Sequence, residues 1–192
     1  MATVVLFHHV QGLTPGVRAF AESLRSAGHT VHAPDFFDGT LYDSIDEGFA
    51  AVQERGFAAL DAWADDAVAS ASPADDLVLA GISLGVMPAQ RITQTHSGVK
   101  AGLFLEACVP VSEFGDWPEG KPAQIHGGDA DPFFAKEGDM DAAAALAERE
   151  EQVELFLYPS DQHLFTDSSL PGYDQESAEK VVRRSLEFLE NL

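Results

Sequence analysis

Residues 81–85, with the sequence GISLG, have the residue types and spacing best suited to covalent chemistry. They follow the apolar run 77–80, which is typical of a buried strand, and precede residues 86–95, which can form a helix. Glycines two positions to either side of a serine let strand and helix approach closely, while the serine takes a strained conformation that raises its hydroxyl above the sheet. With this flanking context the segment predicts Ser83 as a nucleophile; the alternative is a tight turn with an inert serine.

A serine hydroxyl reacts only if a base accepts its proton and an acid orients that base. The acid is expected directly after the predicted strand 123–126, where the turn contains Asp129 and Asp131. We favour Asp131, which precedes a proline in a GxxDP turn, and keep Asp129 as the second choice. Asp before Pro is also common in turns of no catalytic role.

The predicted base is His163, the only histidine beyond the last predicted strand, 153–158. In a parallel sheet this position brings its ring to the carboxyl edge, within reach of Ser83. Serine, acid and histidine then follow in the order that the nucleophile-elbow pattern requires. Four of the other histidines are interpreted as structural or solvent-exposed: His29, His32, His96 and His126.

Short apolar runs alternate with amphipathic segments along the chain, a pattern typical of a parallel sheet covered on both faces. Helices are predicted from the Thr14 cap to Gly28, from the Ser44 capping box through at least Ala67, and over 86–95, 139–150 and 176–192. Strands are predicted over residues 3–7, 30–33, 77–80, 102–105, 123–126 and 153–158.

Composition narrows the choice of partners. The 192 residues include 11 Lys and Arg against 32 Asp and Glu, a net charge of -21, which repels nucleic acid and anionic membrane surfaces. No apolar run approaches the roughly 20 residues of a membrane span, and residues 1–7 are typical of a first strand rather than a signal peptide. The lone Cys108 excludes internal disulfides and agrees with a cytoplasmic location. We expect a single domain, 1–192, as a monomer or homodimer.

The motifs together resemble the dienelactone hydrolase family of α/β-hydrolases. The likeness is carried by residues 4–12, 34–37, 81–85, 126–128, 158–159, 163–165 and 172–173. It implies one α/β domain without a cap, with six parallel strands in the order 2-1-3-4-5-6 and helices on both faces. It further implies hydrolysis of a carboxylic ester or lactone through an acyl-enzyme, with no cofactor or metal. The backbone N–H groups of Leu84 and Val10 would form the oxyanion hole.

Three positions depart from the family pattern. Ser83 stands where typical members have a cysteine nucleophile, and His9 where they have a glutamate in the loop after the first strand. Thr166 and Asp167 stand where an arginine holds the substrate carboxylate. Because of the first two departures, the family's cysteine-activation mechanism cannot be transferred to this chain. The aspartate of the third, together with the net negative charge, predicts a neutral or weakly charged ester, lactone or thioester rather than a dianionic dienelactone.

Specificity is expected from the loops at the strand ends, chiefly residues 35–44 and 107–120. Three residues are candidates for substrate contact: His9, Phe36 and Trp117. The aromatic residues could equally anchor the loops in the core.

Three alternatives stay open. The chain could have lost its chemistry and act as a ligand-binding or regulatory module, or it could be an acyltransferase or thioesterase that uses the same triad. His8, His9, Asp35 and His126 could instead surround a metal, although adjacent residues on a strand point to opposite faces.

Overall fold

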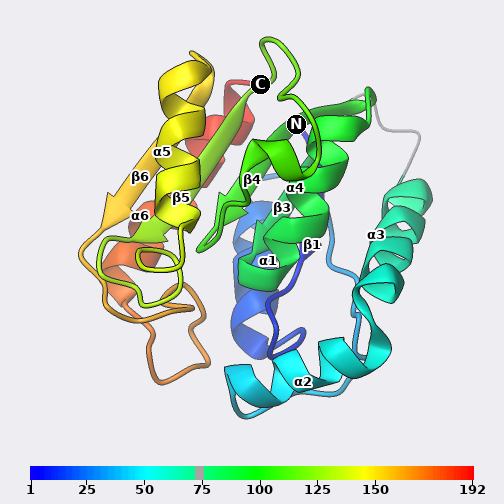
Figure 1. The fold of residues 1–192 in the computed structure, drawn as a ribbon, viewed down its shortest axis with the longest axis vertical. Helices are drawn as coiled ribbons and strands as arrows, with labels where there is room; N and C mark the ends of the chain where they lie inside the picture. Colours follow the sequence, from blue (N-terminus) through cyan, green and yellow to red (C-terminus); the bar gives the residue numbers. More distant parts are fainter. Residues whose placement is uncertain (72–75) are drawn as a thin grey trace.

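Six parallel strands form one sheet in the computed structural model, which describes residues 1–71 and 76–192. The order β2-β1-β3-β4-β5-β6 confirms the expected topology, and every neighbouring pair is parallel (Figure 1). Such a sheet brings the carboxyl ends of all its strands to one edge. The strands are β1 Thr3–Phe7, β2 Thr30–His32, β3 Leu77–Ile82, β4 Val99–Leu105, β5 Ala123–Gly128 and β6 Val153–Tyr158.

The helices cover both faces of the sheet, as expected for strands that are apolar on both sides. Helices α1 and α6 pack on one face; α3, α4 and α5 pack on the other. Figure 1 shows α2 beyond the lower edge of the sheet. The helices are α1 Pro15–Ser26, α2 Ile45–Arg55, α3 Phe57–Ala71, α4 Val86–Thr95, α5 Asp139–Arg149 and α6 Gln175–Glu190, with short 3-10 turns at Ser83–Gly85 and Val111–Glu113. No helix in the described parts of the chain combines the length and apolar composition needed to span a membrane.

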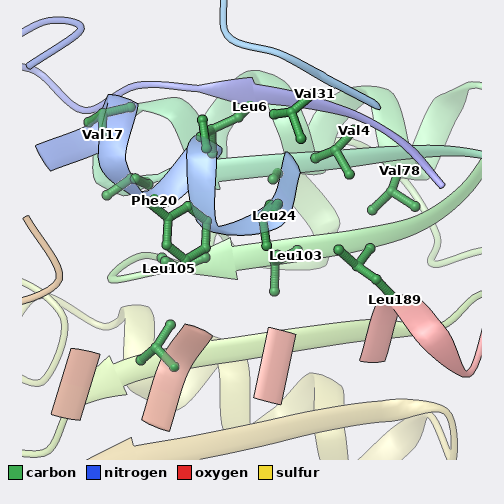
Figure 2. Close-up of a cluster of buried hydrophobic side chains, with 14 of the residues drawn as sticks. Val4, Leu6, Val17, Phe20, Leu24, Val31, Val78, Leu103, Leu105 and Leu189 are labelled. Atoms are coloured by element: carbon green, nitrogen blue, oxygen red, sulfur yellow. The ribbon is translucent and has the colours of Figure 1, made fainter. Parts of the chain in front are cut away.

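Alternation along the strands divides the core into two layers. In β1, Val4 and Leu6 belong to the cluster under α1 and α6, whereas Val5 and Phe7 belong to the cluster under α3, α4 and α5. This follows from the period of two in a strand, which sends successive side chains to opposite faces. Figure 2 shows the first cluster, in which Leu6 and its strand neighbours meet the apolar side of α1 and Leu189 of α6.

Local sequence explains the ends of the first helix. The Thr14 side chain accepts a hydrogen bond from the Val17 N–H, and Pro15 occupies the first helical position. Gly28, with a φ of 95°, follows its last turn. These residues confirm the predicted boundaries.

One predicted helix is two. The helix that begins after Ser44 ends at Arg55, because Gly56 takes a φ of 87° and α3 starts anew at Phe57. Phe57, the first residue of α3, is 40% exposed and packs edge-on against Phe49 of α2. The other boundaries differ by a few residues: β2 ends one residue early, and β3, β4 and β5 are longer than predicted.

The junction between β1 and the start of α4 leaves no room for a side chain at Gly85. A methyl group built there would lie 2.2 Å from the Phe7 carbonyl oxygen, a backbone atom that cannot move independently. Gly85→Ala is therefore expected to lower the free energy of unfolding by about 1–3 kcal/mol, measured by urea denaturation. Gly98→Ala is the matched control, because its methyl group would meet only the exposed His96 ring. Equal losses in the two variants would contradict this account of the junction.

Candidate active site

Ser83 lies on the turn that joins β3 to α4, at the carboxyl edge of the sheet. Its φ is 50°, a left-handed conformation that is uncommon for residues other than glycine. The turn is so tight that a side chain at Gly81 would lie 2.3 Å from the Gly85 carbonyl oxygen. Small residues on both sides thus permit the strained serine that the sequence pattern predicts.

His163 reaches Ser83 from the loop that follows β6. Its Nε2 lies 2.8 Å from the Ser83 Oγ. The Phe133 ring packs against the imidazole, with 4.7 Å between ring centroids, and the His163 side chain is 6% exposed. Phe133 had no predicted role, although it directly follows the GxxDP turn.

Asp131 holds the other side of the imidazole. Its Oδ2 lies 2.7 Å from His163 Nδ1, and its Oδ1 accepts a hydrogen bond from the Phe133 N–H. The carboxylate is fully buried. Asp129, the second choice for the acid, is exposed. The structure therefore brings together Asp131, His163 and Ser83.

These contacts define which nitrogen of the neutral imidazole carries the proton. An ionised Asp131 only accepts, so His163 Nδ1 carries the proton and Nε2 accepts from the Ser83 hydroxyl. Burial lowers the pKa of His163, but the hydrogen bond to Asp131 and the charges of Glu106 and Asp139 outweigh it and raise the pKa above its ordinary value. The ring is thus a stronger base than a free histidine.

The sequence predicts an oxyanion hole from the backbone N–H groups of Leu84 and Val10. Leu84 is in the first turn of the helical segment after Ser83, where N–H groups have no acceptor within the helix. Val10 follows β1, and its N–H has no hydrogen-bond partner among the described residues. The two side chains belong to the same buried cluster, which places their loops next to each other.

The three candidates for substrate contact have other roles. His9 is fully buried; its Nε2 donates to Asp167 at 2.8 Å and its Nδ1 accepts from the Gln11 N–H. Both ring nitrogens are therefore used within the protein. Phe36 is also buried, in the cluster that contains Val10, so it anchors its loop. Both side chains are thus held by contacts within the protein, and their contact with a substrate stays a prediction.

Trp117 is a core residue far from Ser83. Its ring meets Phe104 edge-on, and its N–H donates to the Lys121 carbonyl. The Lys121 ammonium in turn bonds to the Thr93 carbonyl, at the end of α4 opposite to Ser83. The 107–120 segment belongs to the connection that leads from the carboxyl end of β4 back to the amino end of β5.

Asp167 does not face a substrate either. Its carboxylate is fully buried and accepts hydrogen bonds from His9, Thr14 and Ser169. Burial opposes ionisation, but the hydrogen bonds from His9, Ser169 and Thr14 prevail and lower the pKa of Asp167 to about 2. The negative charge of Asp167 is therefore stabilised by hydrogen bonds within the protein.

Glu106 is a buried acid that sequence analysis missed. It follows β4 directly with a φ of 63° and is fully buried. Its Oε1 accepts from the Thr166 N–H in the loop of His163, while its Oε2 has no partner among the described residues. Burial raises the pKa of Glu106 to about 7, although His163 and Thr166 favour the ionised form. The only sequence feature that could have indicated this residue is a single acidic side chain directly after the apolar run 102–105.

Two further expectations concern metals and the cysteine. Across residues 1–71 and 76–192, no three His, Cys, Asp or Glu side chains are placed to hold a metal ion. His8 is bonded to backbone groups, and His126 to Tyr158 and Gln124. Cys108 is buried, and burial raises the pKa of its thiol to about 12. A thiol with that pKa is a poor nucleophile at neutral pH.

The sheet order, the strained serine at a strand-to-helix turn and the acid and histidine after β5 and β6 define an α/β-hydrolase fold. The family model described as "Dienelactone hydrolase family" matches residues 1–192. The chain belongs to the dienelactone hydrolase family.

Solved structures of similar fold include three relevant examples. A dienelactone hydrolase-like promiscuous phosphotriesterase from metagenomic libraries has a TM-score of 0.78 at 18% identity, with 100% of this chain and 87% of that one covered. An esterase from Pyrococcus furiosus has a TM-score of 0.65 at 17% identity (99% and 83% covered). Esterase 2 of Thermogutta terrifontis, phosphorylated by paraoxon, has a TM-score of 0.66 at 18% identity (99% and 82% covered). No curated protein matches the chain.

The raised pKa of Glu106 predicts how stability changes with pH. The folded protein holds this proton up to about pH 7, whereas the unfolded chain releases it near 4.5, so folding loses stability as the pH rises between these values. Glu106→Gln removes that titration. From pH 5 to pH 8 the wild type should lose about 1–3 kcal/mol more unfolding free energy than Glu106→Gln, by urea denaturation at each pH. Parallel pH profiles of the two proteins would contradict the assignment.

Proposed function

We propose that the protein is a serine hydrolase that cleaves a carboxylic ester or lactone through an acyl-enzyme. The observation that carries the proposal is the continuous hydrogen-bonded path from Ser83 through His163 to the buried Asp131. A base oriented by a buried acid and bonded to a strained serine is what acyl transfer requires. The family and the esterases among similar folds support the same reaction.

In the first half of the reaction, His163 Nε2 takes the proton from Ser83 as Oγ bonds to the substrate carbonyl carbon. The carbonyl oxygen becomes an oxyanion that accepts hydrogen bonds from the N–H groups of Leu84 and Val10. Asp131 stabilises the resulting imidazolium through Nδ1–H. The imidazolium then gives its proton to the departing alcohol oxygen as the carbon–oxygen bond breaks, which leaves the acyl group on Ser83.

In the second half, water takes the place of the alcohol. His163 accepts a proton from the water as its oxygen attacks the acyl carbon, and the same two N–H groups hold the second oxyanion. The proton returns to Ser83 Oγ as the acid product leaves. A thiol or amine acceptor in place of water would give acyl transfer with the same residues.

A neutral or weakly charged acyl group fits this site best. The chain has a net charge of -21, which repels anionic substrates over the distance at which they approach. Because Asp167 is bonded within the protein, this preference rests on the overall charge and not on a direct contact with Asp167. The phosphotriesterase and the paraoxon-phosphorylated esterase of similar fold make neutral phosphotriesters a second group to assay.

Removal of the serine hydroxyl tests the proposal directly. Ser83→Ala should lower kcat on short-chain p-nitrophenyl esters at least about a thousandfold, because no covalent intermediate can form. A fluorophosphonate should add to the wild type and not to Ser83→Ala, by intact mass. Ser70→Ala, an exposed serine on α3, is the matched control and should behave as the wild type. A folded wild type with neither turnover nor adduct would overturn the proposal in favour of a ligand-binding role.

The pH profile of activity reports the state of His163. The base must be neutral to accept the serine proton, and its pKa is raised above the ordinary 6.5. The kcat/KM on a neutral ester should therefore fall as the pH drops through a midpoint above 6.5. Asp131→Asn should move this midpoint to lower pH, because the hydrogen bond from the ring to a carboxylate is lost. A midpoint unchanged in Asp131→Asn would contradict the orientation of His163 described above.

A further inference from the structure

Two adjacent buried histidines hold one peptide unit at the end of β1. His8 Nδ1 lies 2.7 Å from the His9 carbonyl oxygen, and His8 Nε2 accepts from the Phe36 N–H at 3.0 Å. Since Nε2 accepts, the neutral ring carries its proton on Nδ1 and donates it to the carbonyl. The Gly12 N–H donates to that carbonyl as well. The His9 carbonyl is thus fixed by two donors.

The neighbouring ring has the opposite tautomer. His9 Nδ1 accepts from the Gln11 N–H, so Nε2 carries the proton and donates to Asp167 at 2.8 Å. Asp167 also accepts from the Thr14 hydroxyl and from Ser169. Both side chains in this contact, the neutral imidazole and the carboxylate, are fully buried. The ring of His9 therefore ties the loop after β1 to the loop that carries His163.

The peptide unit held in this way is the one that contains the Val10 N–H. A trans peptide directs its N–H opposite to its C=O, so donors at the His9 carbonyl set the direction of the Val10 N–H. On the far side of Val10, its carbonyl oxygen packs against Gly48 of α2, where a methyl group would lie 2.1 Å away. The Val10 N–H is the one group of this unit left without a partner among the described residues.

We infer that His8 and the His9–Asp167 pair are positioning residues that aim the Val10 N–H at the oxyanion formed on Ser83. The inference rests on the proposed function, and it assigns a catalytic consequence to three buried side chains that touch no substrate. A donor fixed before the reaction stabilises the oxyanion without reorganisation, whereas a misdirected donor loses most of that effect.

The test compares an ester with its thiono analogue, p-nitrophenyl butyrate and p-nitrophenyl thionobutyrate. The leaving group and acyl chain are the same, but sulfur is larger and a weaker hydrogen-bond acceptor than oxygen, so the thionoester gains little from an oxyanion hole. Asp167→Asn replaces one acceptor oxygen by an NH2 group, so the donors from His9, Thr14 and Ser169 can no longer all be accepted. It should lower kcat on the oxoester about ten- to a hundredfold and on the thionoester less than about threefold, with KM nearly unchanged. Asp174→Asn, at the N-cap of α6, is the control for the same chemical change.

A second pair of variants decides the matter if Asp167→Asn does not fold. His8→Leu removes the donor to the His9 carbonyl, whereas His8→Asn can keep a donor near the position of Nδ1; both lose the acceptor for Phe36. The ratio of oxoester to thionoester kcat should fall in His8→Leu and be largely retained in His8→Asn. Equal losses on both esters, or equal ratios in the two His8 variants, would reduce these residues to a structural role and overturn the inference. If the wild type cleaves neither ester through Ser83, the proposed function itself fails.

Discussion

The close approach of β1 and the start of α4 is the constraint on which the site depends. The two segments are far apart in sequence, yet β1 and β3 are neighbours in the sheet, with Phe7 in register with Gly81. The turn after β3 can therefore lie directly on the end of β1, provided that no side chain intervenes at Gly85. This one contact places the Ser83 hydroxyl beside the loop of Val10. His163 and Asp131 then complete the site through the hydrogen bonds from Ser83 to His163 and from His163 to Asp131.

Residues 1–71 and 76–192 contain three buried carboxyl groups, and each is accommodated differently. Asp131 is paired with the imidazole of His163, and Asp167 is surrounded by four hydrogen bonds from three residues. Glu106 has one backbone donor, so burial favours its proton. In a chain with a net charge of -21, most acidic side chains are exposed to water. The charge of a buried one must be stabilised by hydrogen bonds or an oppositely charged group, or removed by protonation. Glu106 and Asp131 lie just after strands β4 and β5, and Asp167 lies in the loop that carries His163. The free-energy cost of burying an acidic side chain is therefore borne at the carboxyl edge of the sheet.

The sequence predicted the fold and the meeting of Ser83, Asp131 and His163 because these depend on chain order and periodicity. Strands β1 and β6 and helix α4 have the predicted boundaries, since apolar runs and flanking turns define them. The break at Gly56 was missed because the apolar spacing continues in helical register across it. Side-chain contacts were harder to predict: the directions of His9, Phe36 and Trp117 depend on loops whose paths are set by tertiary packing. No pattern within one segment carries that information.

The adjacent histidines show why such contacts matter for chemistry. His8 and His9 have opposite tautomers. Each tautomer is fixed because one ring nitrogen accepts a hydrogen bond from a backbone N–H. Burial lowers the pKa of His8 to about 4, which keeps it neutral where the proposed reaction runs, so its single proton stays directed at the His9 carbonyl. A lysine or arginine could donate there but could not also accept from Phe36. The requirement for a small neutral group that donates on one side and accepts on the other explains a buried imidazole at this position, with no role for it in proton transfer.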